Sequence, residues 1–108
     1  MKLTLDGDTL NVSDIEELAT ANVTSFRNEL AALPKGVRHI DIDLSHTGFV
    51  DCGGLGALVA LWKTAGGRNG QILIRLLNPP HMVERLIDLM RLDRVFPVER
   101  NASVGVHA

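Results

Sequence analysis

Apolar residues recur along this chain with two different periods, and the shorter period predicts β-strands. Residues 2–5 and 9–12 alternate around Asp6-Gly7-Asp8, which indicates two strands joined by a tight turn. Residues 38–44 alternate strictly, with isoleucine and leucine on one face and histidine and aspartate on the other. A nearly continuous apolar run over residues 71–77 is typical of a central strand that is covered on at least one side.

Three longer segments repeat their apolar residues at helical spacing. They run from about Thr20 through Leu33, from Cys52 to Ala65, and from Pro80 through Met90, and proline or glycine bounds each of them. The third segment carries a wide apolar stripe. We expect three large side chains of these helices to pack in the core or at its edge: Trp62, Met82 and Met90.

Strands that alternate with helices indicate an α/β domain with a mixed, partly parallel β-sheet. A short last strand at residues 95–98, where Pro97 marks a sheet edge, brings the total to about four to five strands. We expect these strands to pack with about three to four helices. The chain of 108 residues suits one domain, over residues 1–100, followed by a flexible tail at residues 101–108.

Composition and charge narrow the classes of function. A chain that is 45% apolar and 22% charged is typical of a soluble globular domain, and the longest apolar run is too short to insert into a membrane. A net charge of −2 and few aromatic residues argue against direct binding of nucleic acid. One cysteine cannot form an internal disulfide, which fits a cytoplasmic protein.

Signals of an enzyme are weak. The sequence contains no phosphate loop, no dinucleotide fingerprint and no pair of metal ligands at helical spacing. Cys52 and His46, the nearest histidine in sequence, could form a nucleophilic pair, but no third residue is placed to orient the histidine. We therefore expect no catalysis, no metal and no other cofactor.

The segment Asp51-Cys52-Gly53-Gly54-Leu55 is the strongest candidate for a site. It opens the second helix, where free N–H groups favour negative charge, and we expect Asp51 to cap this helix. Glycine costs about 1 kcal/mol in a helix relative to alanine. The glycines at positions 53, 54 and 56 therefore indicate that a neighbouring strand or a partner protein approaches the backbone.

The same segment resembles the STAS domain family, which includes bacterial anti-sigma factor antagonists and the tails of sulphate transporters. Members typically have a strand that ends in Asp-Leu-Ser, then an apolar-Asp-Ser-Ser/Thr-Gly-Leu-Gly motif before a helix. The corresponding residues here are Asp43-Leu44-Ser45 and Val50–Gly56. The resemblance continues in three further segments: Leu77-Asn78-Pro79-Pro80, Leu92–Val98 and, more faintly, Glu17 with Thr20-Ala21.

This resemblance implies a protein-interaction module that binds an anti-sigma factor with a histidine-kinase-like ATP-binding fold and so regulates sigma-factor-dependent transcription by partner switching. Residues Asp51–Leu55 would form the partner-binding loop. In phosphorylated members, the kinase modifies the serine or threonine after the motif aspartate. That position is Cys52, and a thiol is not a substrate for a serine kinase. The protein would then behave as a permanently unphosphorylated form, either a monomer or a weak homodimer.

Several alternatives stay open. Ser45 and Thr47 could accept phosphate instead, although short loop hydroxyls usually form turns. Cys52 could be redox-active, but we favour a simple replacement of serine by another small residue. The alternative function is that of a constitutive STAS subunit in a larger assembly, such as a lipid-transport ABC accessory or a stressosome-like complex.

Overall fold

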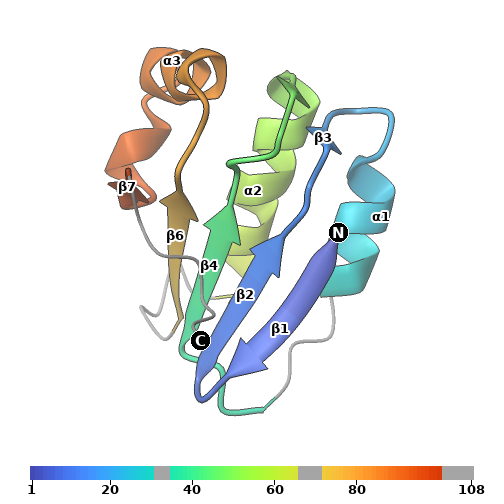
Figure 1. Cartoon of the computed structure of the whole chain (residues 1–108), viewed down its shortest axis with the longest axis vertical. Helices are drawn as coiled ribbons and strands as arrows, with labels where there is room; N and C mark the ends of the chain where they lie inside the picture. Colours follow the sequence, from blue (N-terminus) through green and yellow to red (C-terminus); the bar gives the residue numbers. More distant parts are fainter. Residues whose placement is uncertain (31–34, 66–71, 101–108) are drawn as a thin grey trace.

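The computed structural model describes residues 1–30, 35–65 and 72–100, in which strands and helices alternate as the sequence predicts. The main sheet has five strands in the order β1-β2-β4-β6-β7 (Figure 1). These strands are β1 (Lys2–Asp6), β2 (Thr9–Ser13), β4 (His39–Asp43), β6 (Leu73–Leu77) and β7 (Val98–Glu99). Strand β1 is antiparallel to β2, whereas every later neighbour pair is parallel. The predicted α/β class and mixed, partly parallel sheet are therefore confirmed.

The described residues form three α-helices and one short 3₁₀ helix. The α-helices are α1 (Val23–Leu30), α2 (Cys52–Ala65) and α3 (His81–Leu89), and the 3₁₀ helix η1 is Leu92–Arg94. In Figure 1, α1 and α2 lie behind the sheet, while α3 lies beyond the upper ends of β4 and β6. The sheet thus has its main helical layer on one face, with α3 at one end.

The core lies between the sheet and helices α1 and α2. Buried side chains of β4 and β6 sit side by side in the parallel register: Ile40 with Ile74 and Ile42 with Leu76. Leu55 and Leu58 of α2 are completely buried in the same cluster. Each such side chain contributes roughly 1.5–3 kcal/mol when it leaves water. This layer holds the start of α2 against the sheet.

The opposite face of the sheet carries a buried charge that is paired. Asp41 is buried, and Arg75 faces it in the register of β4 and β6. Arg75 donates to both carboxylate oxygens of Asp41, at 2.8 and 2.6 Å, and also pairs with Glu99. The hydrogen bonds that Arg75 donates to the Asp41 carboxylate raise the pKa of Arg75 above its ordinary value. This bidentate ion pair offsets the free-energy cost of removing the Asp41 carboxylate from water.

Helix α1 begins at Val23 rather than at about Thr20, because the side chain of Asn22 organises a turn before it. The Oδ1 atom of Asn22 accepts a hydrogen bond from Ala19 N–H at 2.8 Å, and its Nδ2 atom donates to the carbonyl of Glu17 at 2.6 Å. Other predicted features lie outside the described residues: the helix end near Leu33, the glycine pair Gly66-Gly67, the strand start at Gln71 and the tail at residues 101–108.

The prediction that Met82 and Met90 pack in the core or at its edge is wrong. Met82 is 82% exposed and Met90 42% exposed, whereas Val83 and Ile87 are the buried residues of α3. Because α3 lies at the end of the sheet, only part of its wide apolar stripe finds a covering surface. Trp62 of α2, in contrast, is partly buried against the core as predicted.

The last strand, β7, is shorter than the predicted strand at residues 95–98 and starts later. Helix η1 precedes it, and the completely buried Phe96 anchors the connection in the core. Val98 and Glu99 lie in register with Leu76 and Leu77 of β6. Strand β7 is nevertheless at the edge of the sheet, as Pro97 indicates.

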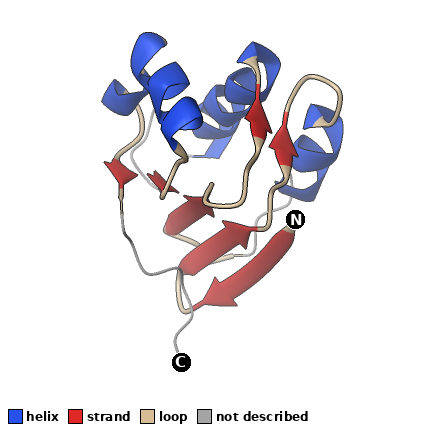
Figure 2. Ribbon diagram, turned by 45° about the horizontal axis from the view of Figure 1, so that its top comes forward, coloured by secondary structure: helices blue, strands red, loops and turns tan. Residues whose placement is uncertain are grey.

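A second, two-stranded sheet was not predicted. Strand β3 (Glu17–Leu18) pairs in parallel with β5 (Phe49–Val50), and Figure 2 shows both as short arrows beyond the main sheet. Two-residue strands are too short to show a period in the sequence. This pairing brings the segment after β2 beside the segment after β4, at the point where α2 begins.

Candidate functional site

The turn that opens α2 is held by the carboxylate of Asp51. Its Oδ1 atom accepts a hydrogen bond from Gly54 N–H at 2.9 Å, which confirms the predicted helix cap. The same carboxylate accepts hydrogen bonds from Thr20 N–H at 3.0 and 3.1 Å and from the Thr20 hydroxyl at 3.4 Å. Asp51 therefore ties the start of α2 to the segment after β3.

These hydrogen bonds also stabilise the charged form of Asp51. The N–H groups of Gly54 and Thr20 lower the pKa of this carboxyl from its ordinary value of 3.8. A carboxylate that accepts several backbone hydrogen bonds is harder to protonate, because protonation removes acceptor capacity. The cap consequently keeps its negative charge at neutral pH.

The glycines of the motif have different surroundings. A Cβ atom on Gly54 would lie 1.7 Å from the carbonyl oxygen of Leu18, and one on Gly53 would lie 2.0 Å from the hydroxyl of Thr20. The neighbour that the sequence predicted for these two positions is thus the chain's own strand β3 and the residues after it. A Cβ atom on Gly56 would meet no atom within 4 Å, so its place faces open space.

The five predicted residues, Asp51 to Leu55, lie together as one turn, which we name the capped turn. Cys52 is exposed at its tip, and Asp51 and Gly53 are half-buried. Gly54 and Leu55 are buried on the core side of the turn. Cys52 is therefore the most accessible residue of the capped turn.

The two alternative phosphate acceptors differ in access. Ser45 is exposed, and its hydroxyl donates to Oδ2 of the buried Asp43 at 2.8 Å, as in a turn. Thr47 is buried, and its hydroxyl donates to the carbonyl of Ile15 at 2.6 Å. A kinase would have to break that contact and expose Thr47 before modifying it, so this geometry favours Ser45 of the two.

A groove lined mainly by apolar side chains lies between β5 and α3. It has a volume of about 330 Å³, and its lining includes Phe49, Met82 and Leu89, which are 52%, 82% and 78% exposed. Arg85 is the one charged residue among the described residues that line it. We name it the α3 groove. It adjoins the capped turn, because β5 ends one residue before Asp51.

His46 and Cys52 do not form the possible nucleophilic pair in the part of the chain that the structure describes. His46 contacts the hydroxyl of Ser45 at 3.5 Å and Asp14 at 3.8 Å, and no contact between His46 and Cys52 is found in the described part of the chain. Within residues 1–30, 35–65 and 72–100, no group of three or more histidine, cysteine or acidic side chains could hold a metal ion.

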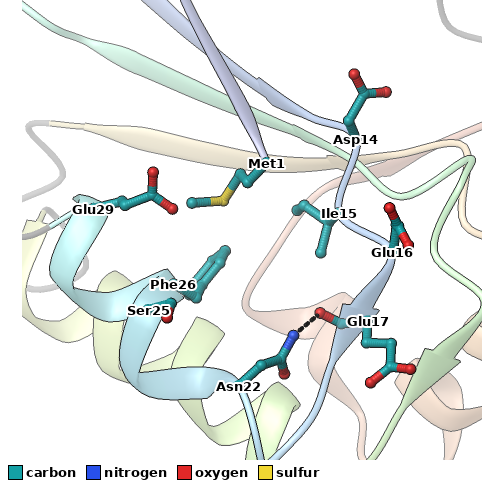
Figure 3. Close-up of a pocket in the computed structure, with 9 residues that line it drawn as sticks. All are labelled: Met1, Asp14, Ile15, Glu16, Glu17, Asn22, Ser25, Phe26 and Glu29. Atoms are coloured by element: carbon teal, nitrogen blue, oxygen red, sulfur yellow. Dashed lines mark hydrogen bonds between the residues drawn. The ribbon is translucent and has the colours of Figure 1, made fainter.

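A separate cavity of about 350 Å³ lies between α1 and the segment that contains β3 (Figure 3). The side chains of Met1, Ile15 and Phe26 point toward its centre, whereas those of Asp14 and Glu17 point away from it. Its acidic side chains therefore do not converge on one point. None of the capped-turn residues lines this cavity.

Comparison with known proteins identifies the family of this chain. A family model described as "Mlab, STAS domain" matches residues 1–99. The chain belongs to this STAS family. The STAS assignment agrees with the capped turn, with the mixed sheet and with the motif residues at the start of α2.

A sequence relative and two solved structures extend the comparison. The STAS domain is 27% identical to the "Anti-sigma F factor antagonist" of Paenibacillus polymyxa over 82 residues. This alignment covers 76% of this chain and 68% of the relative. A Thermotoga maritima protein described as a candidate anti-sigma factor antagonist has a TM-score of 0.78 at 24% identity, covering 91% of this chain and 84% of that one. The unphosphorylated form of the antagonist SpoIIAA has a TM-score of 0.68 at 21% identity, with 90% and 85% coverage. At these identities the two structures show the fold alone.

The STAS family is a regulatory fold rather than an enzymatic one, and this chain is an anti-sigma factor antagonist-like member of it. No helix in the described ranges has the length and apolar character of a membrane span.

Sequence reasoning missed the contact between Thr20 and Asp51, which are 31 residues apart. The signal that could have found it was the faint family spacing at Thr20-Ala21. It also missed the α3 groove, because a helical period does not tell which part of a wide stripe is covered.

Proposed function

We propose that this STAS domain is an anti-sigma factor antagonist that acts in the cytoplasm and binds its partner through the capped turn. The observation that carries the proposal is the exposed tip at Cys52 on a turn fixed by Asp51 and Thr20. The relative from Paenibacillus polymyxa, an anti-sigma F factor antagonist, supports the class of partner. Binding would release a sigma factor and so change transcription.

The rigidity of the capped turn favours recognition of a protein surface. Asp51 accepts hydrogen bonds from two separate segments, so the turn is already ordered before a partner arrives. A preformed surface loses less conformational entropy on binding than a mobile loop. Gly56 faces open space one turn further on, so a partner could approach the backbone of α2 closely there.

The α3 groove supports a protein partner over a small ligand. Phe49, Met82 and Leu89 expose apolar surface beside the capped turn. Contiguous exposed apolar surface on a small domain is typical of a protein interaction site. We infer that the partner covers the capped turn and the α3 groove together.

The partner that we propose is an anti-sigma factor with a histidine-kinase-like ATP-binding fold. A phosphate after Asp51 would add about −1.5 to −2 charges at neutral pH next to an existing carboxylate, and this would oppose binding. The thiol of Cys52 does not accept phosphate from a serine kinase. The protein would therefore stay competent to bind and would be controlled by its concentration or by competing partners.

The test is to measure, by isothermal titration calorimetry, the affinity of this protein for purified anti-sigma factors of the source organism. We expect Cys52→Asp to weaken binding by about 1–3 kcal/mol, because it forces an unpaired charge into the interface. Asn28→Asp is the matched control, since it adds the same charge at an exposed position of α1. Thermal unfolding of each free variant checks that the fold is intact. Equal affinities for both variants and the wild type would place the binding face elsewhere.

A second candidate function is a constitutive subunit of a larger assembly, such as a lipid-transport ABC accessory or a stressosome-like complex. The thiol at position 52 favours it, because a permanent subunit has no need of a phosphate switch. The two functions differ in the fate of the complex. A constitutive subunit would stay bound to its partner in the presence of sigma factor, whereas an antagonist would compete with it.

A further inference from the structure

Strand β1 is an edge strand of the main sheet. It pairs with β2 on one side, and the described residues supply no main-chain partner on its other side (Figure 1). The N–H and C=O groups along such an edge can pair with another strand. Two of its side chains, Leu3 and Leu5, are 39% and 49% exposed although they are apolar. The edge therefore offers both backbone groups and apolar surface.

The five residues of β1 are chemically self-complementary. They read Lys2-Leu3-Thr4-Leu5-Asp6, with opposite charges at the two ends, a leucine inside each and a threonine at the centre. If a second copy pairs antiparallel about a two-fold axis at Thr4, Lys2 faces Asp6 of the second copy. Leu3 then faces Leu5 of the second copy, and the two threonines face each other. Each of these is a favourable cross-strand pair.

Both faces of the sheet match in this register. Leu3 and Leu5 lie opposite Val12 and Leu10 in β2, so they point to the face that carries the core. Lys2 and Asp6 point to the other face because side chains alternate along a strand. A shift by one residue would set leucines against polar residues, and a shift by two would lose both charge pairs. One register therefore satisfies the charges and the apolar side chains together.

We propose that β1 is a homodimer edge, through which two copies join antiparallel into one continuous sheet. The occupant is a second copy of this chain, because a single strand supplies both members of every cross-strand pair. The proposal is independent of the proposed function. The paired segment is short, so the dimer is expected to be weak and to depend on protein concentration.

The first measurement is sedimentation velocity of the full chain without an added N-terminal tag, over a range of concentrations. The wild type is expected to shift from monomer to dimer as its concentration rises. Lys2→Asp and Asp6→Lys each place like charges opposite one another at both ends of the pairing, and each is expected to raise the dimer Kd by about tenfold. The double variant Lys2→Asp/Asp6→Lys restores both pairs with the charges exchanged. Its Kd is expected to return close to that of the wild type.

Asp88→Lys is the control, since it makes the same charge reversal at an exposed position on α3, away from β1. It should leave the dimer Kd unchanged. Thermal unfolding confirms that each variant folds, and Leu5→Lys provides a second disruption that acts through the apolar pair. A wild type that remains monomeric at all concentrations would overturn the proposal. A dimer that neither single charge reversal weakens would overturn it as well.

Discussion

At the scale of single residues, Asp51 shows what sequence reasoning can and cannot reach. Its place before a helix predicts a cap, and the hydrogen bond from Gly54 N–H confirms that cap. The hydrogen bonds from Thr20 depend on a contact across 31 residues, which no local pattern encodes. The local half of the interaction was therefore predictable, and the long-range half was not.

The lowered pKa of Asp51 predicts a pH-dependent contribution to stability. The unfolded state binds more protons than the folded state between the ordinary value of 3.8 and the lower folded pKa. The contribution is therefore fully present above 3.8 and disappears as the pH falls through the folded pKa. Asp51→Asn removes the contribution of the carboxylate charge to folding stability but keeps a side-chain oxygen that can accept a hydrogen bond. Its stability deficit relative to the wild type should be largest at neutral pH.

Urea unfolding of the wild type and of Asp51→Asn, between about pH 2 and 7, measures this difference. Asp88→Asn is the control, because Asp88 is an exposed carboxylate away from the capped turn. The deficit of Asp51→Asn should shrink in strongly acidic solution. A deficit that is constant across the whole pH range would mean that the charge of Asp51 has no role in the cap.

At the scale of elements, the pairing of β3 with β5 explains why α2 opens with glycines. The backbone of Leu18 comes so close to Gly54 that a side chain there would collide with its carbonyl. Periodicity predicted the longer strands and α2, because their buried faces repeat over several turns or pleats. It could not predict two-residue strands, nor that α3 would leave Met82 and Leu89 exposed at the end of the sheet.

Alanine at two glycines of α2 separates close approach from helix propensity. Gly54→Ala should destabilise the fold by about 1–3 kcal/mol, because β3 has to shift away from the new methyl group. Gly56→Ala meets no neighbour within 4 Å and should stabilise the helix by up to about 1 kcal/mol. Urea unfolding of both variants provides the comparison. Equal and small effects at the two positions would contradict the close packing of β3 on α2.

At the scale of the whole molecule, the two proposed interfaces use separate parts of the fold. Helix α3 and the start of α2, which carry the α3 groove and the capped turn, lie at the end of the sheet where β4 and β6 terminate. Strand β1, in contrast, forms a lateral edge of the sheet (Figures 1 and 2). A dimer joined through β1 would therefore carry two capped turns. The order of strands and helices was predictable, but the surfaces that this order leaves uncovered emerged only from the packing of the elements.

The most direct test of the central claim asks whether this protein releases a sigma factor from its anti-sigma factor when ATP is present. Fluorescence anisotropy of labelled sigma factor measures the release over time. The wild type should release the sigma factor, and the release should persist because Cys52 does not accept phosphate. Cys52→Ser should release it at first and then lose this activity, with intact mass showing one added phosphate. Failure of the wild type to release the sigma factor at saturating concentration, or a release that decays as ATP is consumed, would contradict the account.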